Sequence, residues 1–149
     1  LNRLVEKMRA KYGNRVIYKK GALKGILSEF KKNRGVGILM DQAVFKDEGY
    51  IIDFLGRPAW TTKMPALIAR KTGATVLPIF INRYNDKHVI NIYPAVDFST
   101  DIDAERAIIA DTKRFSSFIE NYIIEHPTEW LWIHRRWKRT KQWSDGVME

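Results

Sequence analysis

The sequence predicts an α/β fold in which flanking helices cover a mixed, largely parallel central sheet. Segments with helical periodicity alternate along the chain with short apolar runs, which is the order expected of this class. Two of these runs, residues 36–40 and 75–81, are apolar without alternation, as in strands that are buried on both faces of a parallel sheet. The chain has 149 residues, 45% of them hydrophobic, which suits one domain with a substantial core.

The first part of the chain predicts two helices joined by a short strand. Residues 1–12 carry apolar side chains at helical spacing and are followed by Gly13, a common helix stop. Residues 15–18 are a strand candidate. Residues 22–32 carry a second apolar stripe and end before Gly35.

The middle of the chain predicts a long loop and then a helix. Residues 41–60 have little periodicity, so we expect a loop with at most a short strand over 50–54, and loops of this length usually carry function. Thr61 or Thr62 is expected to cap a helix with Pro65 in its first turn and Gly73 just past its end.

The last part of the chain predicts a strand and a long helix. Residues 88–93 alternate in polarity, as in a half-exposed strand. Asp101 or Asp103 is expected to start an amphipathic helix that ends before Pro127. Residues 144–149 are expected to form a flexible tail, which leaves residues 1–143 as the domain. No run approaches the roughly 18 consecutive apolar residues of a membrane span.

Charge and cysteine content narrow the function classes. The net charge is +9 and the isoelectric point is about 9.8, so the protein attracts nucleic acid, anionic lipid headgroups or an acidic protein. The absence of cysteine excludes disulfides and thiolate catalysis, and it fits a reducing compartment.

Residues 130–138 are the most distinctive segment. They hold three tryptophans and four basic or potentially basic residues. Indole rings favour the boundary between water and hydrocarbon, and Arg and Lys pair with phosphate. Such a surface suits an anionic amphiphile such as a phosphorylated lipid. The alternative is that the tryptophans belong to the core and the bases form a solvated rim.

Several residues are candidates for a binding site. Asp41 and Gln42 directly follow the predicted strand 36–40, and ligands in open α/β sheets bind beyond the carboxyl ends of strands. Asp41 could equally cap a turn or hold a neighbouring arginine. Thr62 lies at a predicted helix N-terminus, which suits phosphate or simply a cap. Arg3 and Arg9 suit bidentate contact with phosphate or carboxylate.

The residues do not indicate a catalytic base, a cofactor or a metal. The three histidines lack the context of a nucleophile elbow, and no glycine-rich phosphate loop is present. No cluster of histidines and acids has metal-ligand spacing. We therefore expect neither a metal nor a cofactor.

Five segments match one known family in the expected order: residues 38–42, 53–62, 65–74, 76–80 and 127–138. Together they resemble the bacterial lipid A biosynthesis late acyltransferases of the lysophospholipid acyltransferase superfamily. The resemblance implies a glycerolphosphate-acyltransferase-like fold. It also implies transfer of a fatty acyl chain from acyl carrier protein to a hydroxyl of a phosphorylated lipid A precursor. The implied place is the cytoplasmic face of the bacterial inner membrane, as a peripheral protein in lipopolysaccharide biosynthesis.

One departure from the family affects the expected activity. The family's catalytic signature is a histidine followed five positions later by an acid, in which the histidine removes the acceptor hydroxyl proton. None of the three histidines here is followed at that distance by an acid. We therefore expect residues 1–143 to be the C-terminal part of one acyltransferase domain, incomplete and inactive without the catalytic pair.

The resemblance also assigns roles to single residues. Asp41, in a supporting role, and Arg9 are the catalytic candidates, with Asp41 holding a basic active-site group. In the closing basic motif, packing and phosphate contact are both open roles. The substrate-binding candidates are Arg3, Gln42, Thr62, Arg135, Arg136 and Lys138.

Two other functions remain as alternatives. Basic residues interleaved with aromatics also suit single-stranded nucleic acid, although no recognisable RNA-binding signature is present and a nucleic-acid partner is not expected. The other alternative is a non-catalytic protein that binds anionic lipid.

Overall fold

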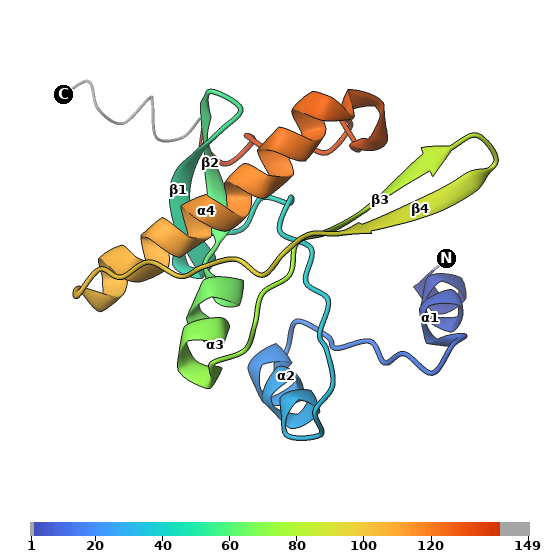
Figure 1. The fold of residues 1–149 in the computed structure, drawn as a ribbon, viewed down its shortest axis with the longest axis horizontal. Helices are drawn as coiled ribbons and strands as arrows, with labels where there is room; N and C mark the ends of the chain where they lie inside the picture. The colour runs from blue at the N-terminus through green and yellow to red at the C-terminus, as the bar shows by residue number, and fades with distance from the viewer. Residues whose placement is uncertain (1, 141–149) are drawn as a thin grey trace. The chain divides into compact units, whose positions relative to one another are not determined.

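The computed structural model describes residues 2–140 and is drawn in Figure 1. It divides into two compact units, with the boundary between Ile38 and Leu39. The tail predicted over residues 144–149 lies outside the described residues.

The first unit contains the two predicted helices. They are α1 (Asn2–Ala10) and α2 (Ala22–Phe30), and α2 ends two residues earlier than expected. Gly13 and Gly21 have φ angles of +81° and +78°, a region that favours glycine. The strand expected over 15–18 does not form, because that segment has no partner strand in this unit.

Glu29 organises the end of α2. Its carboxylate accepts hydrogen bonds from Arg15 at 3.2 Å and from Arg34 at 3.0 Å, and Lys32 Nζ lies 3.7 Å away. These cations hold the pKa of the Glu29 carboxyl below its ordinary value, chiefly through the hydrogen bond from Arg34. Stabilisation of the carboxylate in the folded state is what lowers this pKa.

We expect Arg34→Gln to raise the pKa of Glu29 toward its ordinary value of 4.5, because the main donor is lost. The pKa of Glu29 is lower in the folded protein than in the unfolded chain. The stabilisation that the ionised Glu29 provides is therefore fully present above pH 4.5 and is lost as the pH falls through the folded pKa. A carboxyl ¹³C titration by NMR measures this pKa directly. Arg83→Gln, which removes an exposed arginine from the other unit, is the control, and an equal titration of Glu29 in both variants would contradict the prediction.

The second unit begins with a β-hairpin. Strands β1 (Gly49–Phe54) and β2 (Arg57–Thr62) pair antiparallel, with Phe54 opposite Arg57. Leu55 and Gly56 form the two-residue turn and have φ angles of +53° and +74°, as in a type I′ turn. The predicted loop over 41–60 is therefore wrong in its second half, although the short strand over 50–54 is confirmed.

A second hairpin follows helix α3. Strands β3 (Ile79–Tyr84) and β4 (Lys87–Ile92) also pair antiparallel. The strand predicted over 88–93 is confirmed, but it is exposed along nearly its whole length rather than alternately. The strand predicted over 75–81 begins only at Ile79.

The sheets correct the predicted topology. Within residues 2–140 both sheets have two antiparallel strands, and the largely parallel central sheet is not confirmed. Residues 36–40 form no strand. An apolar run can adopt an extended backbone alone, but it becomes a sheet strand only where a neighbour supplies hydrogen bonds. The mixed α/β composition is confirmed.

Helices α3 (Met64–Thr72) and α4 (Ala104–Glu125) complete the second unit, with short 3₁₀ turns at Lys46–Glu48 and Pro127–Glu129. Lys63, rather than Thr61 or Thr62, occupies the cap position of α3, because both threonines end β2. Asp103 caps α4 by accepting a hydrogen bond from the Arg106 backbone N–H at 2.7 Å, as predicted.

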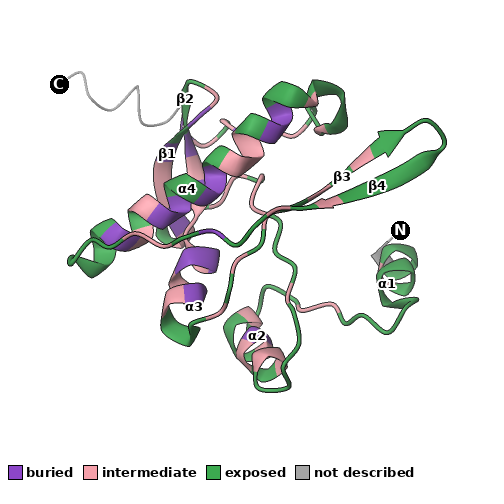
Figure 2. Ribbon diagram, in the orientation of Figure 1, coloured by how far each residue is buried: buried purple, intermediate pink, exposed green. Residues whose placement is uncertain are grey.

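Helix α4 crosses the β1–β2 hairpin (Figure 1), and buried residues occur along its length (Figure 2). One buried cluster contains Phe54, Ala59 and Ile123, and a second contains Ala66, Val96 and Phe115. The first cluster is completed by the residues that follow α4, and those residues form the candidate site.

A buried ion pair ties α3 to α4. Arg70 Nε donates to Asp111 Oδ2 at 2.5 Å, and the Ser99 backbone N–H donates to Asp111 Oδ1 at 2.7 Å. Arg70 also donates to the Ser99 carbonyl at 2.7 Å. Asp111 is fully buried, so both of its oxygens depend on these partners.

Candidate functional site

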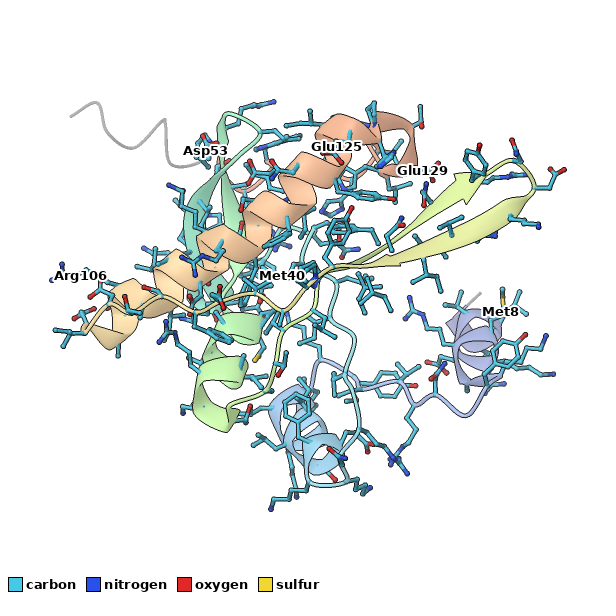
Figure 3. All side chains as sticks on the ribbon, viewed as in Figure 1. Met8, Met40, Asp53, Arg106, Glu125 and Glu129 are labelled. Carbon is cyan, nitrogen blue, oxygen red and sulfur yellow. The ribbon has the colours of Figure 1, made fainter. Side chains whose placement is uncertain are left out.

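Residues 127–140, named here the closing segment, follow α4 and return to the β1–β2 hairpin. They begin near Glu125 and Glu129, which are labelled in Figure 3. Trp130 and Trp137 pack against Phe54, with ring centroids 5.8 Å and 6.1 Å from its ring. Trp137 Nε1 also donates to the Phe54 carbonyl at 3.2 Å. These two tryptophans therefore belong to the core, which is the alternative that the sequence left open.

Arg136 is the central cation of the closing segment, and it is buried. Its Nη1 donates to the Trp60 carbonyl and its Nη2 to Thr61 Oγ1, both at 2.6 Å. Its guanidinium carbon lies 4.6 Å from the centroid of the Phe54 ring, a favourable cation–π distance. Arg136 Nε has no hydrogen-bond partner within the part of the chain that the structure describes. Arg136 thus fastens the closing segment to β2.

Burial also changes the acidity of Arg136. It lowers the pKa of the guanidinium well below its ordinary value, to about 10, while the negative charges of Asp41 and Glu120 act in the opposite direction. Removing a cation from water without a carboxylate in direct contact destabilises its charged form, so the pKa falls. The two carboxylates limit this effect.

The closing segment also holds residues 41–45, named here the Asp41 loop. Asp41 Oδ2 accepts from Trp130 Nε1, His134 Nε2 accepts from the Ala43 N–H, and Arg139 Nη1 donates to the Ala43 carbonyl, all at 3.2 Å. His134 must present a bare Nε2 to accept this hydrogen bond.

The Arg139 guanidinium also contacts the Asp41 loop by stacking on the Phe45 ring, with its carbon 3.7 Å from the ring centroid. His134 and Arg139 were missed as contributors to the site. His134 lies in the closing basic motif of residues 127–138 and Arg139 directly follows it, which was the signal that could have indicated them.

The structure brings some of the predicted site residues together and leaves others apart. Asp41 and Arg136 lie where the closing segment meets the Asp41 loop and the hairpin. Thr62 ends β2, and its hydroxyl accepts a hydrogen bond from the Met64 backbone N–H at 3.3 Å rather than contacting the closing segment. Arg3 and Arg9 are exposed on α1 in the other unit. The remaining candidates are exposed on the second unit: Gln42, Arg135 and Lys138.

In the described residues 2–140, no group of three histidines or acids is placed to hold a metal ion. Within the same residues, no helix combines the length and apolarity needed to cross a bilayer.

Comparison with known proteins decides the family. Residues 1–139 match the model of the family described as bacterial lipid A biosynthesis acyltransferase. The chain belongs to this acyltransferase family. The resemblance drawn from five segments of the sequence is thereby confirmed, and it extends over nearly the whole chain.

Two curated relatives illustrate the range of the lipid A acyltransferase family. A phosphatidylinositol mannoside acyltransferase of Mycobacterium tuberculosis is 31% identical over 113 residues, which is 75% of this chain and 34% of the relative. A lipid A biosynthesis acyltransferase of Haemophilus influenzae is 24% identical over 142 residues, covering 92% of this chain and 42% of the relative. The chain therefore spans well under half the length of either relative.

Proposed function

We propose that the protein acts in transfer of a fatty acyl chain from acyl carrier protein to a hydroxyl of a phosphorylated lipid A precursor. The observation that carries this proposal is the family match over residues 1–139. The net charge of +9 supports it, since both an acidic carrier protein and a phosphorylated acceptor are attracted to a basic protein. The proposed place of action is the cytoplasmic face of the bacterial inner membrane.

The names of the two relatives bear on the acceptor. One name specifies lipid A biosynthesis and the other phosphatidylinositol mannoside. Both are lipids that combine sugar and phosphate, and that combination suits a site with exposed Arg and Lys. We favour a lipid A precursor because the family model carries that description.

The contacts support separate roles for the acidic and basic candidates. Asp41 is held in place by Trp130, so it can orient a basic group or a substrate hydroxyl with little reorganisation. Arg135 and Lys138 are exposed and are proposed to contact the phosphates of the acceptor. For Arg136, burial and its two hydrogen bonds favour the packing role.

The other candidates retain their proposed roles. Arg3 and Arg9 would act near the thioester carbonyl or the phosphates, and Gln42 and Thr62 would contact substrate. The sequence has no histidine followed five positions later by an acid. The proposal therefore places the proton-removing base outside these 149 residues.

We expect the 149-residue chain to bind a phosphorylated lipid A precursor but not to acylate it when acyl carrier protein loaded with a fatty acid is supplied. Binding to detergent-solubilised precursor can be measured by fluorescence anisotropy, and transfer by mass spectrometry. The double variant Arg135→Gln/Lys138→Gln should weaken binding about tenfold, as expected for the loss of two charge-assisted phosphate contacts. The matched double variant Arg83→Gln/Lys87→Gln, which removes the same charge from the β3–β4 hairpin, should bind like the wild type.

Each outcome of this experiment has a separate meaning. Acyl transfer by the chain alone would overturn the placement of the base outside it. Failure to bind any phosphorylated lipid, together with a salt-sensitive gel shift of single-stranded oligonucleotides, would favour the nucleic-acid alternative.

A further inference from the structure

Three consecutive apolar side chains project from the closing segment. Leu131 is 61% exposed, Trp132 is 54% exposed and Ile133 is 85% exposed. We name residues 131–133 the apolar tip. Its neighbours Trp130 and His134 are fastened to Phe54 and to Ala43, so the tip lies between two fixed points.

Local contacts fix the shape of the tip. Trp132 Nε1 donates to the Pro127 carbonyl at 2.5 Å, and the Trp132 ring meets the Trp130 ring edge to face at 4.7 Å. The His134 N–H donates to the Leu131 carbonyl at 3.1 Å. Because the backbone and the indole are both held, little conformational entropy would be lost when the tip enters another phase.

Basic residues accompany the tip. Arg135 and Lys138 follow it directly and are exposed. This composition matches a membrane interface with anionic headgroups. Indole rings concentrate at such an interface, Lys and Arg are attracted to its negative charge, and aliphatic side chains enter its apolar side.

We propose that the apolar tip inserts into the interfacial layer of an anionic phospholipid membrane. This places Arg135 and Lys138 at the level of the headgroup phosphates, the layer in which the phosphates of a lipid acceptor also lie. This inference rests on the proposed function and names its membrane contact. The segment that carries the tip also grips the Asp41 loop, so membrane contact would present that loop to a lipid acceptor.

Vesicle binding by the full 149-residue chain tests the inference. Vesicles of phosphatidylcholine with about one third phosphatidylglycerol should sediment the wild type more strongly than pure phosphatidylcholine, and added salt should weaken this binding. Leu131→Ser/Ile133→Ser should weaken binding to the anionic vesicles by about tenfold or more, because two aliphatic side chains no longer enter the interface. Both positions are exposed, so thermal unfolding should remain close to wild type.

Ile102→Ser is the matched control. Ile102 is fully exposed and lies between Asp101 and Asp103, so an anionic surface should not attract it, and the variant should bind like the wild type. If the double variant unfolds, Ile133→Ser alone should still weaken binding about threefold, about half the free-energy loss of the pair.

The vesicle experiment contains neither an acyl donor nor a lipid A precursor. Its result therefore bears on membrane contact and not on acyl transfer. Equal binding by the wild type and Leu131→Ser/Ile133→Ser, or no binding by the wild type, would overturn the membrane contact and leave acyl transfer to be judged by its own test. Retention of oligonucleotides in place of vesicles would also overturn it.

Discussion

Replacing Asp111 with alanine is expected to lower the free energy of unfolding by about 3 kcal/mol, the lower end of the cost of breaking a buried ion pair by removing one partner, because the Arg70 side chain is partly exposed to water. Asp111 is fully buried and accepts from Arg70 Nε and from the Ser99 N–H. The substitution leaves the Arg70 Nε–H and the Ser99 N–H without this acceptor. The hydrogen bond from Arg70 to the Ser99 carbonyl then remains as a polar link between α3 and the segment that contains Ser99.

Chemical denaturation measures this loss as a lower midpoint with an unchanged slope. Asp86→Ala is the matched control, since Asp86 pairs with Arg83 at 3.8 Å on the surface and is fully exposed. Exposed ion pairs contribute about 0 to 1 kcal/mol, so this variant should unfold almost like the wild type. Similar midpoints for the two variants would contradict the structural role assigned to Asp111.

Arg136→Ala is expected to cost about 3 kcal/mol or more, because two hydrogen bonds from a charged group are lost, each worth about 1.5 to 3 kcal/mol. A cavity also opens beside Phe54, over which the guanidinium lies. Arg136→Met should cost less, since methionine fills much of the space and carries no buried charge. Denaturant midpoints of the three proteins test this order, and an alanine variant as stable as the methionine variant would contradict it.

The same pair of proteins gives a pH test. The pKa of Arg136 is about 10 in the folded state, well below its ordinary value, so the unfolded chain binds this proton more tightly above pH 10. The stability of the wild type relative to Arg136→Met should therefore rise as the pH increases through 10. The difference in the free energy of unfolding between the two proteins is the quantity to compare, because the titration of their shared tyrosines and lysines cancels in it.

The helices were predictable because their signals are local. Asp103 marks the start of α4, and Pro65 and Gly73 bracket α3, each through backbone chemistry within one turn. The error at the start of α3, where Lys63 rather than a threonine takes the cap position, arose because Thr61 and Thr62 belong to β2.

The β1–β2 hairpin was not predictable in full. Its turn uses Leu55 in a left-handed conformation, where Asn or Gly is usual. The Leu55 N–H donates to Glu120 Oε2 at 3.0 Å, across 65 positions of sequence. A contact that distant leaves no local pattern, and for the same reason strand pairing could not be derived from apolar runs alone.

The candidate site was predicted only in part. Asp41 was identified by its place after an apolar run, and the closing basic motif by its composition. Sequence could not show that Trp130 would hold Asp41, or that His134 and Arg139 would hold Ala43, because those pairings depend on how the chain returns after α4.

The way the closing segment is fastened has a consequence for the order of folding during synthesis. Its hydrogen bonds to the Asp41 loop and to β2 join residues 75 to 96 positions apart, so none can form until the ribosome has added the later partner. Synthesis adds about 5 to 20 residues per second, so the side of the β1–β2 hairpin that packs against the closing segment stays exposed for about 4 to 20 seconds after it is made. We expect the nascent chain to need a chaperone most during this interval, and slow codons just before Trp130 to lower its yield.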